Sequence, residues 1–205
     1  MDINNINISY NNTIIYKDFN IHIEDNKINC IVGPSGCGKT TLLNYLAKHF
    51  INRKIDIGFI FQEDRLIPWK NIYENLYLIS KGYYDKDTAK EKVIKVLGDL
   101  ELIEFRNLYP NQLSGGMKQK INIARALISR VEMLIMDEPF KSIDEKGKIK
   151  IIKFIKNKII KEKLTVIFVS HDKEEVNLLS DRVIILGEKP VKIIKKYDIQ
   201  ENFSY

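Results

Sequence analysis

The sequence predicts an α/β fold with a mostly parallel central sheet, an N-terminal antiparallel β subdomain and an inserted helical subdomain. Short apolar runs typical of buried strands alternate with segments of helical periodicity along most of the chain. A glycine-rich loop joins one apolar run to a helical segment at residues 33–40. From about residue 71 to 112 apolar residues recur at helical spacing with charges between them, which predicts the helical insertion.

Size and composition indicate one globular domain over residues 1–205. No apolar run approaches the roughly 20 residues of a membrane span, and the N-terminus lacks the pattern of a secretory signal. Cys30 and Cys37 are expected to stay reduced. The net charge of +6 is best explained by solvated, lysine-rich helix faces rather than by an anionic lipid surface, and no nucleic acid partner is expected.

The N-terminal part predicts two antiparallel strands and then a strand, a loop and a helix. Residues 3–8 and 13–23 alternate apolar and polar side chains, as half-buried strands do. Residues 28–32 are an apolar run that enters the glycine-rich loop. After Lys39, leucines recur at helical spacing. A strand, a loop and a helix in this order are the setting that a phosphate-binding loop requires.

The remaining elements alternate around the helical insertion. Pro110 closes the insertion, and Ser114 is a natural N-cap for a helix that runs to about residue 129. A further helix is expected over residues 146–161, and only a short polar tail after Leu186. Buried strands are expected at residues 57–61, 132–136, 165–169 and 183–186.

The glycine-rich loop matches GxxxxGK[ST] at every fixed position, which predicts a P-loop NTPase core. Its residues are Gly33, Pro34, Ser35, Gly36, Cys37, Gly38, Lys39 and Thr40. Glycines let backbone N–H groups surround phosphates, and the helix that follows adds a partial positive charge. We expect Lys39 to contact the β- and γ-phosphates of a nucleotide and the Thr40 hydroxyl to bind Mg²⁺. Cys37 is expected to be a small filler.

Two acids end the apolar run that leads to residue 137. Asp137 can hold Mg²⁺ through its water shell, because this hard cation prefers oxygen ligands. Glu138 is expected to act as the general base that polarises the attacking water. Both can face the nucleotide if the backbone turns at the end of the strand. The alternative, two acids that face solvent, is disfavoured beside a phosphate loop.

The stretch Leu-Ser-Gly-Gly-Met-Lys-Gln at residues 113–119 lies between the phosphate loop and the two acids. In this order the motifs resemble the ATP-binding-cassette (ABC) family, from residue 10 to about residue 186. The resemblance implies an ATPase that uses ATP and Mg²⁺ and works as a head-to-tail homodimer. It also implies that part of each chain acts on the ATP of the other chain, namely Ser114, Gly115, Gly116 and Gln119.

The resemblance assigns roles to further residues. His171 matches the switch histidine that contacts the γ-phosphate, and Gln62 matches the glutamine that senses γ-phosphate and Mg²⁺ and couples to a membrane partner. Asp144 matches the loop that communicates between the two ATP sites. Lys141 departs from the small residue that most relatives have at the start of this loop.

Aromatic and hydroxyl side chains complete the expected site. Relatives place an aromatic ring near Tyr10 to stack on adenine, and Tyr16 is a rival candidate. Thr41 is expected to reach the α-phosphate, as the family's next hydroxyl residue does. The segment from Lys39 to Gln62 is shorter than in relatives, so the antiparallel subdomain is expected to be trimmed there.

The stretch Phe-Gln-Glu-Asp-Arg-Leu-Ile-Pro-Trp at residues 61–69 looks like importer cassettes of the nitrate/sulfonate/taurine group. This resemblance implies a peripheral subunit on the cytoplasmic face of the membrane that drives a permease and, through it, serves a solute-binding protein. Trp69 would anchor a permease helix.

Three alternatives stay open at this point. A soluble ABC protein of translation or DNA repair would co-purify with ribosomes rather than with a permease. An ABC exporter or a lipid-linked cassette would differ in its permease partner. A non-ABC kinase is disfavoured, because it would need neither the 113–119 motif nor His171.

Overall fold

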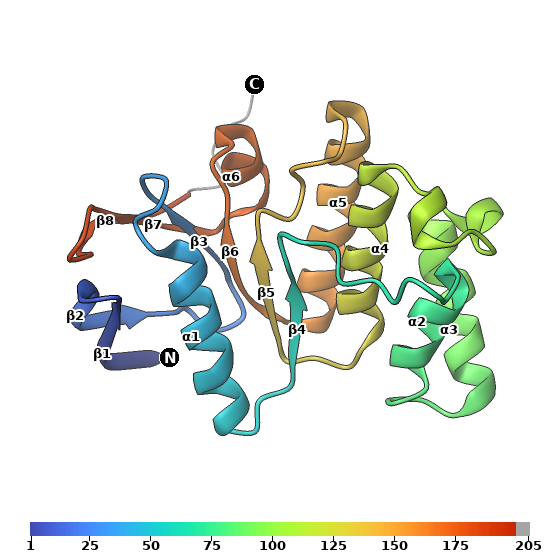
Figure 1. The fold of residues 1–205 in the computed structure, drawn as a ribbon, viewed down its shortest axis with the longest axis horizontal. Helices are drawn as coiled ribbons and strands as arrows, with labels where there is room; N and C mark the ends of the chain where they lie inside the picture. Colours follow the sequence, from blue (N-terminus) through green and yellow to red (C-terminus); the bar gives the residue numbers. More distant parts are fainter. Residues whose placement is uncertain (200–205) are drawn as a thin grey trace.

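The computed structural model describes residues 1–199, which form a six-stranded sheet and a separate two-stranded sheet (Figure 1). The strands are β1 (Asp2–Tyr10), β2 (Thr13–His22), β3 (Ile28–Val32), β4 (Ile57–Ile60), β5 (Met133–Asp137), β6 (Thr165–Val169), β7 (Arg182–Leu186) and β8 (Ile193–Asp198). The helices are α1 (Lys39–Asn52), α2 (Ile72–Ser80), α3 (Lys86–Asp99), α4 (Gly115–Ile128), α5 (Glu145–Glu162) and α6 (Lys173–Leu179).

The large sheet has the strand order β4-β5-β6-β3-β7-β8. Strands β3 to β7 pair in parallel, and β8 pairs antiparallel to β7 at one edge. The carboxyl ends of β4, β5, β6 and β3 therefore lie side by side along the same end of the strands, which is called the carboxyl edge of the sheet below. In such sheets ligands bind in the loops that follow these strand ends.

Alternate residues of the central strands enter two different hydrophobic cores. Ile135 and Ile167 pack with α1 and with the β1–β2 sheet. Leu134 and Val166 pack with the helices α2 to α5 on the other face. Figure 1 shows α1 on one side of the sheet and α4 and α5 on the other. Because both faces are covered, these strands are continuous apolar runs in the sequence.

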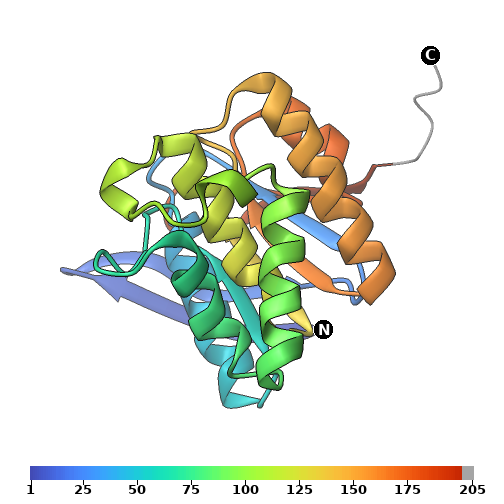
Figure 2. The same ribbon diagram turned by 90° about the vertical axis from the view of Figure 1, so that its right-hand side faces the viewer.

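The helical insertion consists of α2 and α3, whose apolar side chains share one hydrophobic core with those of α4. Figure 2 shows the insertion, in green, beside α4. Asn71 caps α2 in a capping box with Glu74, and Asp85 caps α3. Pro110 opens a short 3₁₀ turn just before α4. The helices predicted here are confirmed, whereas the division into one domain with a subdomain at 71–112 stays a prediction.

The end of the chain corrects one expectation. After Leu186 we expected only a polar tail, but Ile193–Asp198 form β8 at the edge of the sheet. Five of its six residues are exposed, so it lacks the apolar pattern of a buried strand. The helix α6, which was also not predicted, has only 7 residues, too few for a clear helical period. Residues 200–205 lie outside the described part.

Only residues 53–56 separate α1 from β4, and they contain no helix or strand; that this segment is trimmed relative to relatives stays a prediction. The antiparallel subdomain in the described chain is the β1–β2 pair. None of the helices in residues 1–199 has both the length and the apolar character that a membrane crossing requires.

Candidate nucleotide-binding site

The parallel sheet brings the predicted site residues to its carboxyl edge. Gln62 follows β4, Glu138 follows β5, His171 follows β6, and the glycine-rich loop follows β3. These four strands are neighbours in the order β4-β5-β6-β3. Residues that are far apart in the sequence therefore meet because their strands end at the same edge.

The Lys39 side chain folds back over the glycine-rich loop and binds to backbone carbonyl groups of the loop. Lys39 is only 6% exposed, and its ammonium donates to the carbonyl oxygens of Gly33 and Pro34 at 2.9 and 2.8 Å. Both acceptors are neutral, so the positive charge inside the loop is not cancelled by these contacts. The loop therefore presents a fixed cation to an anionic ligand.

The start of α1 adds further attraction for an anion. Gly38 is its N-cap, and it has no side chain that could accept from the first N–H groups of the helix. These N–H groups and the helix dipole favour a phosphate at this point. Cys37 is buried in the core beneath the loop, as expected of a filler, and Thr41 is half-buried.

Asp137 and Thr40 lie together beside the loop. Asp137 is 4% exposed. This burial raises the pKa of its carboxyl, whereas a hydrogen bond from the Thr40 side chain and the charge of Lys39 act in the opposite direction. A hydroxyl and a carboxylate in contact offer two oxygen ligands of the kind that Mg²⁺ prefers.

Glu138 is at the centre of a polar cluster. Its φ of 46° lies in the left-handed region, and this turn lets consecutive residues both reach the site. His171 Nε2 lies 3.2 Å from Glu138 Oε1, and the Gln62 amide donates to Oε2 at 3.3 Å. Lys141 Nζ lies 3.2 Å from the same Oε2. In this structure Gln62 thus contacts Glu138, and its expected role as a metal ligand stays a prediction.

A cavity of about 450 Å³ adjoins this cluster, with Ser35, Glu138 and His171 in its wall. Beside it Lys148 pairs with Asp172 and with Glu175. The hydrogen bond and charge of Lys148 hold the pKa of Asp172 below its usual range, whereas burial raises the pKa of Glu175. This network was not predicted. Its only signal in the sequence was the position of Asp172 directly after His171.

The stretch at residues 113–119, called the signature motif from here on, contains the start of α4. Ser114 is its N-cap and accepts from the N–H of Met117. A Cβ on Gly116 would lie 3.0 Å from the carbonyl oxygen of Ser142, so the helix approaches the loop after β5 closely. Figure 1 shows α4 and α1 on opposite sides of the central strands. The expected action of Ser114 and Gly115 on the ATP of a second chain stays a prediction.

Gln119 and Asp144 have contacts inside their own chain. Gln119 is 4% exposed, and its amide donates to the carbonyl oxygen of Pro139 at 2.7 Å. Its direct effect is thus on the loop that carries Glu138, and its expected action on a partner's ATP stays a prediction. Asp144 is the N-cap of α5, where a hydrogen bond from the Gly147 N–H lowers its pKa.

The two candidate aromatic residues differ in exposure. Tyr16 is 1% exposed, and its hydroxyl donates to the carbonyl oxygen of Gly38 at 3.1 Å. Its ring is therefore not available to stack on a base. Tyr10 is 71% exposed at the end of β1 and remains the predicted stacking residue.

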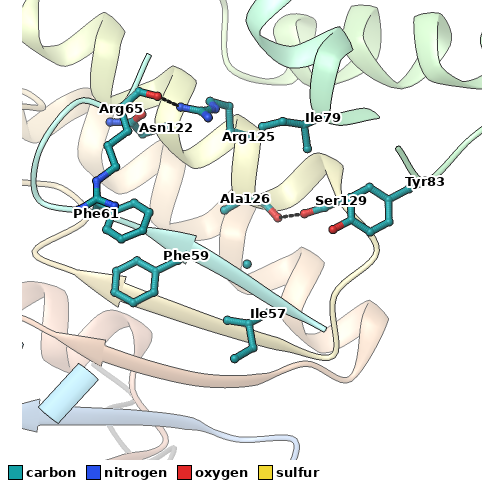
Figure 3. A pocket seen from close by; sticks show the side chains of 11 residues that line it. Ile57, Phe59, Phe61, Arg65, Ile79, Tyr83, Asn122, Arg125, Ala126 and Ser129 are labelled. Carbon is teal, nitrogen blue, oxygen red and sulfur yellow. Dashed lines mark hydrogen bonds between the residues drawn. The ribbon is translucent and has the colours of Figure 1, made fainter. Parts of the chain in front are cut away.

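A second cavity, of about 250 Å³, lies between β4 and the helical side of the molecule (Figure 3). The rings of Phe59 and Phe61 stack in it at 4.1 Å, and the Arg65 guanidinium lies over the Phe61 ring. Arg125 of α4 donates to the Arg65 carbonyl oxygen. Two residues that line the cavity, Phe61 and Arg65, flank Gln62 in the sequence. The cavity therefore adjoins the loop whose Gln62 side chain reaches Glu138.

These features define a class of protein: a nucleotide-binding cassette in which a phosphate loop and a carboxylate pair meet at the carboxyl edge of a parallel sheet. A family model described as ABC transporter matches residues 16–141. The chain therefore belongs to the ABC transporter family, and it is an ATPase of that family with the predicted fold class.

The relatives are similar over nearly the whole chain. The "Aliphatic sulfonates import ATP-binding protein SsuB" of Bacillus thuringiensis subsp. konkukian is 36% identical over 93% of this chain and 80% of its own length. SsuB 2 of Pseudomonas syringae pv. tomato is 33% identical over 86% of this chain and 77% of its own. A solved dimeric, post-hydrolysis structure of the cassette MJ0796 with ADP and Pi has a TM-score of 0.86 and 27% identity, covering 98% of this chain and 99% of that one.

Proposed function

We propose that this chain hydrolyses ATP to drive a membrane importer of sulfonate-like small solutes, the nitrate/sulfonate/taurine type. The cluster around Glu138 is the observation that supports the catalytic part. Relatives that are named as sulfonate import ATP-binding proteins support import rather than a soluble role in translation or repair.

The chain's own groups bind and orient the nucleotide. The N–H groups of the loop and Lys39 hold the phosphates, and Tyr10 stacks on the base. Thr40 would hold Mg²⁺ directly, with Asp137 acting through water and Gln62 at the γ-phosphate side. The metal supplies charge neutralisation on the phosphate oxygens.

Glu138 accepts the proton of the attacking water in this proposal. His171 and Gln62 both contact its carboxylate, so they hold it in place at the carboxyl edge of the sheet. A base within hydrogen-bond reach of its water contributes about 10²- to 10⁴-fold to the rate.

Two copies complete each site. Helix α4 lies on the other side of the sheet from α1, the helix that follows the phosphate loop (Figure 1), and Ser114, Gly115 and Gly116 are proposed to reach the ATP of a facing chain. Their N–H groups would surround the γ-phosphate on the side that a single loop leaves open. ATP then favours the closed pair, and loss of the γ-phosphate releases it.

The permease is proposed to dock on the cytoplasmic side at the cavity beside Gln62. An apolar floor of Phe59 and Phe61 suits an inserted helix. Trp69 is 76% exposed in the segment that follows and would serve as an anchor. A solute-binding protein would act through this permease. Co-purification of the tagged chain with a multi-span permease supports this partner, and co-purification with ribosomes contradicts it.

The substitution Glu138→Gln tests the catalytic assignment, because the amide keeps the shape but accepts no proton. We expect turnover to fall at least about 100-fold, ATP binding to persist, and a dimer to accumulate in gel filtration with ATP. Glu174→Gln is the matched control, since Glu174 is an exposed acid just beyond His171. Undiminished turnover in Glu138→Gln would remove Glu138 from this role.

A further inference from the structure

Lys141 is placed beside Glu138 by the turn that both residues share. The Lys141 N–H donates to the Glu138 carbonyl oxygen at 3.4 Å, which brings residues three apart in the chain side by side. Phe140 is 1% exposed and Ile143 is 8% exposed, so the backbone on both sides of Lys141 is anchored in the core. The Lys141 side chain itself is 61% exposed. It can therefore leave Glu138 without disturbing the fold.

The contacts of Glu138 limit where a water can bind. Oε2 accepts a hydrogen bond from Gln62 at 3.3 Å and lies 3.2 Å from the Lys141 ammonium in an ion pair, and a carboxylate oxygen has about two acceptor positions. Oε1 has His171 at 3.2 Å. A water that gives its proton to Oε2 must therefore compete with the Lys141 ammonium for a place beside this oxygen. Gln62 and His171 follow other strands, β4 and β6, whereas Lys141 lies in the same turn as Glu138. Lys141 is therefore the group whose contact with Glu138 is local to this loop.

We propose that Lys141 is a positioning residue that restrains Glu138 and competes with the attacking water, so that it lowers the ATPase rate of the cassette. This inference rests on the proposed role of Glu138 as the base. It goes beyond that role because it assigns a contact that slows hydrolysis to Lys141, a residue outside both the phosphate loop and the 113–119 motif.

The full chain with Lys141→Met tests the restraint, because methionine keeps an unbranched stem and removes the charge. An exposed ion pair is worth about 0–1 kcal/mol, so we expect kcat to rise roughly threefold, which is about 0.65 kcal/mol. The KM for ATP should stay the same, because Lys141 does not hold the nucleotide. Lys141→Arg keeps the positive charge and should have the low kcat of the wild type. Added salt screens the ion pair, so it should reduce the difference in kcat between the wild type and Lys141→Met.

Two controls make the result specific. Lys146→Met removes an exposed lysine from the first turn of α5 and should leave kcat unchanged. Lys141→Met in the Glu138→Gln background should add nothing, because the group it restrains is gone. Equal unfolding midpoints in urea will show that the variants are folded.

The outcomes separate the two proposals. If Glu138→Gln is inactive but Lys141→Met is unchanged or slower, the restraint is refuted while Glu138 remains the base. If Lys141→Met also speeds the Glu138→Gln variant, the lysine acts elsewhere and the inference fails. If Glu138→Gln keeps full turnover, the base assignment fails and the restraint fails with it.

Discussion

Gly38 permits a direct test of how the phosphate loop is built. Its φ of 119° and ψ of 16° lie in a region that residues with a side chain rarely adopt. A Cβ at this position would lie 2.6 Å from Ile15 Cγ2 and 3.3 Å from the Tyr16 ring. Ile15 is 7% exposed and β-branched, so it cannot swing aside. Gly38→Ala therefore combines backbone strain with a steric clash.

The expected loss in the free energy of unfolding of Gly38→Ala is the sum of the backbone strain and the steric clash. Strain of this kind costs about 1–3 kcal/mol, and overpacking costs about 1–3 kcal/mol more. Gly36 is the matched control, because its φ is 73° and a Cβ there meets nothing within 4 Å. Gly36→Ala should pay only the strain, about 1–2 kcal/mol.

Urea unfolding of the nucleotide-free protein, followed by far-UV circular dichroism, measures both variants. Fluorescence is a poor probe, because the single tryptophan, Trp69, is already 76% exposed. We expect Gly38→Ala to lose at least about 1 kcal/mol more than Gly36→Ala, since overpacking costs that much. If the two variants lose the same free energy of unfolding, close packing of Gly38 on Ile15 is not what requires glycine there.

Two more predictions concern stability. Gly98→Ala should stabilise the protein by about 0.5–1 kcal/mol, because Gly98 lies in α3 with open space around it; an unchanged or lower melting temperature would contradict this. Lys148→Met should cost about 3 kcal/mol at pH 7, because it leaves the buried Glu175 without its cation. Burial raises the pKa of Glu175 above 4.5, so its pair with Lys148 is lost as the pH falls through that raised pKa. Lys148 holds the pKa of Asp172 below 3.8, so the Asp172 part of the stabilisation is lost only at lower pH. Urea unfolding at pH 7 and near pH 3 should therefore show a smaller penalty in acid, and equal penalties would disprove the pairing.

The phosphate loop and the strands around it were predictable because their signals are local. A buried parallel strand is one apolar run, and the residues from Gly33 to Thr40 act through consecutive backbone groups. Elements without a strong local pattern were missed for the same reason. The edge strand β8 buries little apolar surface, and α6 is too short for a period, so neither has a strong pattern in the sequence.

The roles of Gln119 and Lys141 depend on contacts between distant or turned segments. Gln119 precedes Pro139 by 20 positions, and no spacing rule indicates that its amide holds that carbonyl oxygen. Lys141 was visible as a departure from relatives, but its contact with Glu138 needs the turn at φ 46°.

The amino-acid order alone was enough to nominate the groups that are proposed to bind phosphate, hold a divalent cation and accept a proton, because each group's chemistry belongs to its own side chain or to a short loop. The strand order β4-β5-β6-β3, which places those groups side by side at the carboxyl ends of the strands, came only with the folded chain. Pairing between strands depends on the packing of all layers at once, and no short stretch of residues contains that information.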